Sequence, residues 1–356
     1  MSTFSLSLQN LFDEDQAFIY AKNNDGSFDY SVIGGYAGSS KNLVLPSSKN
    51  GVLLKEIGNQ AFRSIKIDTV VIPNGVEVIG KQAFEYCGLQ SISLPSTLKT
   101  INEYAFSGNK LTSLSIPTSV TFIGRRAFNQ NSLPDSEAYI YKRTSSGIDY
   151  STIVSYGGAS RSITIPAIKN GVTLKTIVNA SFYESNLTSV VIPDTVTSIE
   201  MLAFNNNKLP DSDAFIYKRT ASGIDYSTIV SYGGANKQVN VPASKNGVAL
   251  RTIDRYAFYQ TYITSVTLPE GLKTINNSAF ELCYLDELTI PSTVTSIGTN
   301  AFKKIFSWGN FNSFDQIINK SSTAFNWTSI TGGIGNNTFV TGTITHPYGN
   351  IIVKSS

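Results

Sequence analysis

Short stretches of the chain alternate hydrophobic and polar residues, and one such stretch recurs nine times between residues 46 and 302. In each copy the alternating run ends at an Ile-Pro, Val-Pro or Leu-Pro pair, a Val-x-x-Ile or Leu-x-x-Ile segment follows, and Ala-Phe or Ser-Phe closes the unit. Before one of the prolines, Leu114 and Ile116 alternate with Ser113 and Ser115. This period of two predicts a short strand with one buried face, which the proline ends. The pattern therefore predicts many short strands and little helix.

The spacing of the prolines indicates a stack of coils. Successive prolines stand 27, 22, 22, 49, 27, 49, 27 and 22 residues apart, so each gap is 22 residues, 22 plus 5 or 22 plus 27. Self-similarity at about 20 to 29 residues is typical of a leucine-rich-repeat solenoid, in which each coil contacts only its neighbours. We predict a mostly β leucine-rich-repeat solenoid of about nine coils at residues 46–302, an N-terminal cap with a β-hairpin at 1–45, and a C-terminal cap at 303–356.

Three coils carry five extra residues around a Lys-Asn-Gly sequence, at residues 49–51, 169–171 and 245–247. Asparagine and glycine both tolerate a positive φ, and Asn-Gly is the strongest tight-turn dipeptide. We expect each insertion to form an outward loop that leaves the stack undisturbed.

The two 49-residue gaps contain insertions, near residues 135–161 and 211–237, whose amino-acid sequences are almost the same. From Tyr141 to Gly158 and from Tyr217 to Gly234, 17 of 18 positions are identical, and a looser copy precedes the first coil. Each copy reads as a strand, a glycine-containing turn and a second strand. We predict β-hairpins that leave the solenoid and return to start a long coil.

These hairpins are the candidate binding surface, because tyrosine and arginine are enriched where binding energy concentrates. In the alternative interpretation the tyrosines pack on the edge of the stack, since alternation turns some aromatic side chains inward. The candidate binding residues are Tyr141, Lys142, Arg143, Tyr150 and Tyr156 in the first hairpin and Tyr217, Lys218, Arg219, Tyr226 and Tyr232 in the second.

The third position after most of the repeated phenylalanines holds a small residue. In a solenoid, such a side chain lies inside the turn and can satisfy backbone groups of adjacent coils. We therefore interpret both cysteines of the chain as structural, far apart and without a disulfide, rather than as redox or metal-binding groups. The column comprises Cys87, Asn109, Asn131, Ser185, Asn207, Thr261 and Cys283.

Charge and composition argue against several classes of function. The net charge is +3, from 28 basic and 25 acidic residues, which is too balanced for the cationic surface of a nucleic-acid binder. No apolar run approaches the ~20 residues that span a bilayer. The single histidine, His346, lies outside the repeat, so no Ser-His, Cys-His or metal constellation is expected. We predict a non-enzymatic protein without cofactor or metal, although two carboxylates for glycoside cleavage could still assemble through the fold.

The repeat resembles the BspA-type leucine-rich repeats of bacterial surface proteins, most clearly at Leu111–Phe128, Leu187–Phe204 and Leu285–Phe302. The resemblance implies a monomeric binding or adhesion protein at the cell surface or outside the cell, with a host or matrix protein as its partner. The start of the chain lacks a basic region and a cleavage motif, so we expect that an export segment was trimmed. The aromatic-rich tail with Trp308 and Trp327 is expected to cap the stack. A glycan-binding surface protein that uses these tryptophans is the alternative, and a carbohydrate-active enzyme is less favoured.

Overall fold

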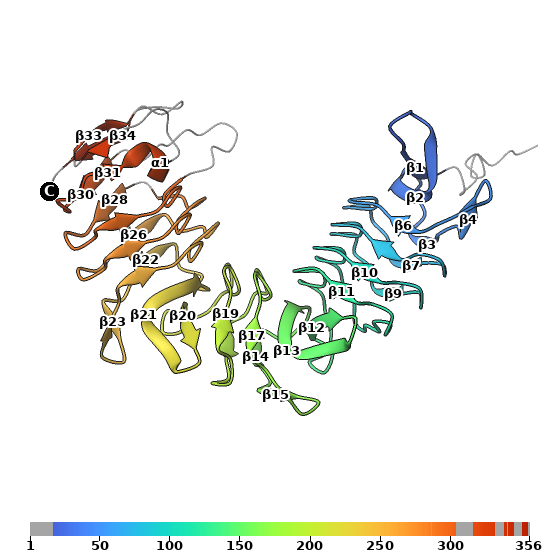
Figure 1. Ribbon diagram of the computed structural model, residues 1–356, viewed down its shortest axis with the longest axis horizontal. Helices are drawn as coiled ribbons and strands as arrows, with labels where there is room; N and C mark the ends of the chain where they lie inside the picture. The colour runs from blue at the N-terminus through green and yellow to red at the C-terminus, as the bar shows by residue number, and fades with distance from the viewer. Residues whose placement is uncertain are drawn as a thin grey trace, which may run out of the picture. The chain divides into compact units, whose positions relative to one another are not determined.

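The computed structural model describes residues 17–285, 287–303, 316–331, 338–339, 341–344 and 351–354. The chain divides into two compact units, one of residues 1–149 with 153–159 and one of residues 150–152 with 160–356. Figure 1 shows that each unit consists of short strands stacked side by side. This is a leucine-rich-repeat solenoid with very little helix, as the sequence predicts.

In the first unit the strands of successive coils stack into two sheets. One sheet has the order β1-β2-β6-β8-β10-β11, and a second has the order β3-β7-β9. Asn50 and Gly51 have φ values of 51° and 78° at the turn between β4 and β5, which confirms a tight turn at the first Lys-Asn-Gly insertion. The strands are β1 (Phe18–Lys22), β2 (Phe28–Tyr36), β3 (Asn42–Val44), β4 (Ser48–Lys49), β5 (Val52–Leu53), β6 (Glu56–Ile57), β7 (Thr69–Val71), β8 (Val78–Ile79), β9 (Ser91–Ser93), β10 (Thr100–Ile101) and β11 (Phe122–Ile123).

The first inserted hairpin pairs β12 (Tyr139–Thr144) with β13 (Gly147–Tyr156) in antiparallel register. In the second unit, the equivalent strands β20 and β21 begin a sheet of order β20-β21-β25-β27-β29. The strands of this unit up to the last coil are β14 (Ser162–Thr164), β15 (Ile168–Lys169), β16 (Val172–Thr173), β17 (Thr176–Ile177), β18 (Ser189–Val191), β19 (Ser198–Ile199), β20 (Phe215–Thr220), β21 (Gly223–Tyr232), β22 (Gln238–Asn240), β23 (Ser244–Lys245), β24 (Val248–Ala249), β25 (Thr252–Ile253), β26 (Ser265–Thr267), β27 (Thr274–Ile275), β28 (Glu287–Ile290) and β29 (Ser296–Ile297).

The repeated phenylalanines form the core of both units. In the first unit the rings of Phe62 and Phe84 stack with centroids 4.9 Å apart and an interplanar angle of 6°. In the second unit Phe258 and Phe280 stack at 4.6 Å and 14°. These separations match the spacing of about 4.8 Å between hydrogen-bonded strands, so one ring fills each coil. All nine phenylalanines are fully buried, as predicted for the residue that closes each coil.

The hairpins are part of the stack, and the prediction that they leave it was wrong for their second strands. β21 pairs in parallel with β25, so that Ile229 lies beside Ile253. The Tyr232 ring stacks on Phe258 at 5.0 Å and 21°. Ser231-Tyr232 therefore takes the place of Ala-Phe. The second strand of the hairpin forms one layer of the stack, which we call a rung. The two units together have about 11 turns, compared with the nine coils predicted for residues 46–302.

The small-residue column inside the turns confirms the structural interpretation of the cysteines. Asn109 donates from Nδ2 to the carbonyl oxygens of Phe84 and Phe106 at 2.8 and 2.9 Å. The Cys87 Sγ donates to the Phe62 carbonyl at 2.9 Å, and burial raises the pKa of this thiol to about 12. Both cysteines are buried, and neither forms a disulfide. Ser185 departs from the prediction, because its buried hydroxyl has no hydrogen-bond partner among the described residues.

The C-terminal segment continues the solenoid beyond its last phenylalanine. β30 pairs in parallel with β28, and the side chains of Ile317, Phe325 and Val353 are buried in the core of the second unit. The elements here are β30 (Gln316–Asn319), β31 (Phe325–Asn326), α1 (Trp327–Thr331), β32 (Thr338–Phe339), β33 (Gly342–Ile344) and β34 (Ile351–Lys354). Trp308 and His346 lie outside the described residues. In the described part of the chain, no helix is long and apolar enough to cross a membrane.

Candidate binding site

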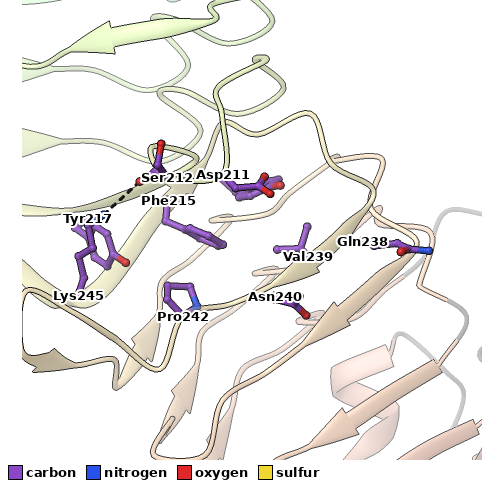
Figure 2. A pocket seen from close by; sticks show the side chains of 10 residues that line it. Asp211, Ser212, Phe215, Tyr217, Gln238, Val239, Asn240, Pro242 and Lys245 are labelled. Atoms are coloured by element: carbon purple, nitrogen blue, oxygen red, sulfur yellow. Dashed lines mark hydrogen bonds between the residues drawn. The ribbon is translucent and has the colours of Figure 1, made fainter.

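A cavity of about 290 Å³ opens in the second unit where the second hairpin meets the coil that follows it. We call it the hairpin cavity. Figure 2 shows the Phe215 ring pointing from β20 toward Val239 and Pro242, with Tyr217 beside Lys245. The complete lining is Asp211, Ser212, Phe215, Tyr217, Tyr232, Gln238, Val239, Asn240, Pro242 and Lys245.

The repeat pattern explains how these side chains come together. β22 carries Val239 inward and Gln238 and Asn240 outward, as alternation along a strand requires. Pro242 follows this strand, and the Lys-Asn-Gly loop then brings Lys245 back toward the hairpin. The Lys245 Nζ donates to the Ser212 carbonyl oxygen at 3.3 Å. This bond ties the loop between β23 and β24 to the segment that precedes β20.

The base of the hairpin cavity is aromatic. Phe215 lies against Tyr232 at 5.3 Å, and Tyr217 meets Tyr226 edge to face at 5.2 Å. Burial raises the pKa of Tyr232 to about 12 and also raises that of Tyr217. Both phenols are therefore protonated at neutral pH, and each can donate a hydrogen bond.

The rim of the cavity is polar. The Asn236 Nδ2 donates to the Asp211 Oδ1 at 2.6 Å, which orients this carboxylate. Gln238 and Asn240 are exposed, whereas Lys245 is partly buried. An aromatic base with a few polar groups at its edge is the usual composition of a small binding pocket. The volume suits one or two side chains of a partner rather than a large free molecule.

The five predicted residues of the second hairpin do not form one surface. Tyr217 and Tyr232 are 8 % and 1 % exposed and line the cavity from inside the fold. Lys218 is exposed and does not belong to the lining, and Tyr226 is partly buried behind Tyr217. A partner can therefore reach Lys218 directly, whereas it can meet the two buried tyrosines only through the cavity.

Arg219 has a structural environment that the sequence did not suggest. Its side chain is 11 % exposed and lies 3.5 Å from Asp194. It donates to the carbonyl oxygens of Pro193 and Ile192 at 3.0 and 3.2 Å. Desolvation lowers the pKa of the guanidinium, and the charge of Asp194 partly offsets this shift. Arg219 therefore fastens β20 to the preceding coil, and it is not presented to a partner.

In the first hairpin the predicted residues show the same distribution of exposure. Tyr141 and Tyr156 are 7 % and 1 % exposed. Lys142 is exposed, and Arg143 and Tyr150 are partly buried. The alternative interpretation of the tyrosines, packing against the stack, therefore describes Tyr141 and Tyr156.

Comparison with known proteins identifies the repeat. The family model described as "BspA type Leucine rich repeat region" matches with 6 copies, at residues 55–149, 151–216 and 238–341. These segments cover well over half of the chain. The chain belongs to the BspA-type leucine-rich-repeat family. The match stops at residue 216 and resumes at 238, so most of the second hairpin of this BspA-type protein lies outside the family pattern.

Solved structures similar to this BspA-type protein are bacterial. A leucine-rich cell-surface protein from Faecalibacterium prausnitzii is 18 % identical, over 90 % of this chain and 97 % of that chain, with a TM-score of 0.37. A leucine-rich-repeat protein from Eubacterium ventriosum is 20 % identical, over 80 % and 92 %, with a TM-score of 0.41. The pneumococcal vaccine antigen PcpA is 15 % identical, over 82 % and 81 %, with a TM-score of 0.39. Likeness at this level carries no argument about function. A search of curated proteins gives no match.

Sequence reasoning missed several residues of the hairpin cavity in this BspA-type protein. Gln238, Asn240 and Lys245 lie in the coil after the hairpin, and Asp211 lies before it. One signal could have located Lys245, because each Lys-Asn-Gly insertion follows a hairpin copy at nearly constant spacing. The other rim residues depend on how one coil stacks on the next, which the sequence pattern does not specify residue by residue.

Proposed function

We propose that this BspA-type protein is a non-enzymatic binding or adhesion protein, located at the cell surface or outside the cell, which engages a host or matrix protein. The hairpin cavity is the proposed contact site in the second unit. The supporting observation is the combination of an aromatic base, formed by Phe215, Tyr217 and Tyr232, with a rim that includes Lys245. The leucine-rich-repeat scaffold of the family is consistent with protein binding.

The surroundings of the cavity favour a protein partner over a small ligand. Val248 pairs across the loop with Lys245 and is 41 % exposed. Beyond the rim, Thr267 of the neighbouring strand β26 is also exposed and lies opposite Asn240. A partner can insert a side chain into the cavity and cover this flat, small-residue surface around it. An anchor in a pocket surrounded by weaker contacts is how binding energy is distributed in protein interfaces.

The test compares two lysines of the same unit. Binding of the full chain to immobilised extracellular-matrix proteins is measured by biolayer interferometry for the parent, Lys245→Ala and Lys218→Ala. Lys245 lines the cavity and Lys218 does not. We expect Lys245→Ala to weaken binding by about tenfold, roughly 1.4 kcal/mol, and Lys218→Ala to leave it within about twofold.

The opposite pattern, with loss of binding only for Lys218→Ala, would place the contact on the outer face of the hairpin and refute the cavity. A Tyr217→Phe variant adds a second check, because it removes the phenol hydroxyl and keeps the ring that packs on Tyr226. If neither Lys245→Ala nor Tyr217→Phe changes the affinity, the hairpin cavity is not the contact site.

A further inference from the structure

The rung formed by the second hairpin has no closing turn. In an ordinary coil the residues around the phenylalanine bond to the next coil through their backbones, as Phe258 N does to Ala279 O at 2.8 Å. At the hairpin rung, Phe204 N instead bonds to the Ser231 Oγ at 3.1 Å. After Tyr232, Gly233 and Gly234 lead directly into the next coil. The turn that each ordinary coil places beside its neighbours is therefore missing at this rung.

Side-chain amides bridge the position of the missing turn. The Asn205 Nδ2 donates to the carbonyl oxygens of Tyr256 and Tyr259 at 3.1 and 3.2 Å. The Asn206 Nδ2 donates to the Gln260 carbonyl at 3.1 Å and to the Tyr183 hydroxyl at 2.8 Å. The three bonds to Tyr256, Tyr259 and Gln260 join residues 51 to 54 positions apart, whereas neighbouring coils are normally joined at about 22, as in the bond to Tyr183 at 23.

A second cavity of about 470 Å³ opens beside these bridges. We call it the joint cavity. It is separate from the hairpin cavity, with which it shares only the buried Tyr232. Four asparagines contribute to it. Asn207 is buried and bonds to backbone carbonyl oxygens, whereas Asn186 and Asn236 are exposed, and a side-chain amide carries both donor and acceptor groups. The asparagines are Asn186, Asn206, Asn207 and Asn236, and the rest of the lining includes Thr261 and Tyr262.

Two exposed tyrosines extend this surface. Tyr262 is 60 % exposed, and Tyr284 is 52 % exposed. Their rings stack at 6.1 Å with an interplanar angle of 16°. Both stand four residues after a repeated phenylalanine, a position that Asn186 and Lys208 occupy in the two coils before the hairpin. Large aromatic side chains exposed to this degree carry no packing role for the core.

We infer that the joint cavity and the Tyr262–Tyr284 pair together form a subsite for a neutral oligosaccharide. Sugar hydroxyl groups both donate and accept hydrogen bonds, which the exposed amides of Asn186 and Asn236 and the exposed Tyr262 hydroxyl match. The aromatic rings offer apolar surface to the C–H faces of a sugar ring. The charged lining groups have both signs, Glu184 against Lys208 and Lys237, which gives no strong preference for an anionic ligand. The subsite goes beyond the proposed protein-binding function and does not depend on it.

Isothermal titration calorimetry of the full chain tests the inference. The probes are the linear tetrasaccharides of glucose, mannose, galactose and N-acetylglucosamine. We expect at least one to bind with a Kd at or below about 1 mM. Tyr262→Ala removes the exposed ring and is expected to weaken that binding by about tenfold or more, whereas Tyr262→Phe keeps the stacking surface and retains it within about threefold.

The matched control is Phe122→Ala, which removes an aromatic side chain 49 % exposed on β11 of the other unit. This variant should bind the tetrasaccharide as the parent does. The inference is overturned if no probe binds up to about 10 mM, or if Tyr262→Ala binds as well as the parent. Lys245→Ala distinguishes the two sites, because it should leave the tetrasaccharide affinity unchanged while it weakens matrix-protein binding.

Discussion

Replacing Asn109 by alanine should cost more stability than almost any other single change at a polar position. Its Nδ2 donates to the carbonyl oxygens of Phe84 and Phe106, and its Oδ1 accepts from the backbone nitrogens of Gly88 and Leu89 at 2.9 and 3.0 Å. One side chain thus satisfies four backbone groups in two coils, three of them in fully buried bonds.

The magnitude follows from what the substitution leaves behind. Each buried backbone group that loses its partner costs about 1 to 3 kcal/mol, so four groups give an upper range of about 4 to 12 kcal/mol. Water can enter at Gly88, which is partly exposed, and the coil can shift to recover part of the loss. We therefore expect Asn109→Ala to lower the free energy of unfolding by about 3 to 5 kcal/mol.

The assay is guanidinium unfolding followed by circular dichroism, combined with amide hydrogen exchange. Asn74→Ala is the control, because Asn74 is exposed and its side chain accepts a hydrogen bond of 3.5 Å from the Ser96 hydroxyl. This substitution should change the free energy of unfolding by less than about 0.5 kcal/mol. In Asn109→Ala the amides of Gly88 and Leu89 should exchange faster than in the parent. A loss below about 1 kcal/mol together with unchanged protection of these two amides would refute the role of the turn asparagine.

Three further predictions concern other parts of the same framework. Cys87→Asn should raise the guanidinium midpoint of unfolding by the equivalent of about 1 kcal/mol, because the amide oxygen of an asparagine could also accept a hydrogen bond from a backbone N–H of the preceding coil. A lower midpoint would contradict this. Arg219→Ala should lower the free energy of unfolding, measured by thermal unfolding, by about 2 to 3 kcal/mol. Lys218→Ala should lower it by less than about 0.5 kcal/mol. Equal effects would contradict the structural role of Arg219. Stability should fall above about pH 8, since the folded-state pKa values of Cys87 and Tyr232, each about 12, exceed the unfolded values of about 8.5 and 10. These groups stabilise the fold in full below their unfolded pKa values and lose that contribution as pH rises toward the folded ones; a flat profile of the guanidinium midpoint from pH 8 to 11 would contradict it.

Most of the fold follows from the sequence because every coil of a solenoid repeats the same local arrangement of strands, turns and core residues. The nine phenylalanines, the strands before eight of the nine prolines and most of the small residues in the turns are fixed by contacts with the neighbouring coil, so periodicity locates them. The strand expected before Pro117 was wrong: residues 113–116 form no strand, and Leu114 and Ile116 are only partly buried. The second strand of each hairpin was predicted, but its place in the stack was missed for one reason. Ser231-Tyr232 closes its rung, and a motif defined by Ala-Phe or Ser-Phe does not include tyrosine.

The candidate site was predictable only in part. The hairpin sequence identified Tyr217, which does line the hairpin cavity. It did not distinguish the partly buried Arg219 from the exposed Lys218, two neighbours on one strand. Gln238 reaches the cavity through the stacking of one coil on the next. The joint cavity arises from a turn that is absent, and an absent turn leaves no motif in the sequence.

Site-specific photo-crosslinking tests whether the partner binds at the hairpin cavity. Gln238, exposed on the rim, is replaced by p-benzoylphenylalanine in one variant, and Lys110, exposed in the first unit, is replaced in another. Each full-length variant is incubated with the matrix protein that the parent chain binds and is then irradiated. We expect a covalent adduct from position 238 and none from position 110. An adduct from position 110 alone would contradict this expectation.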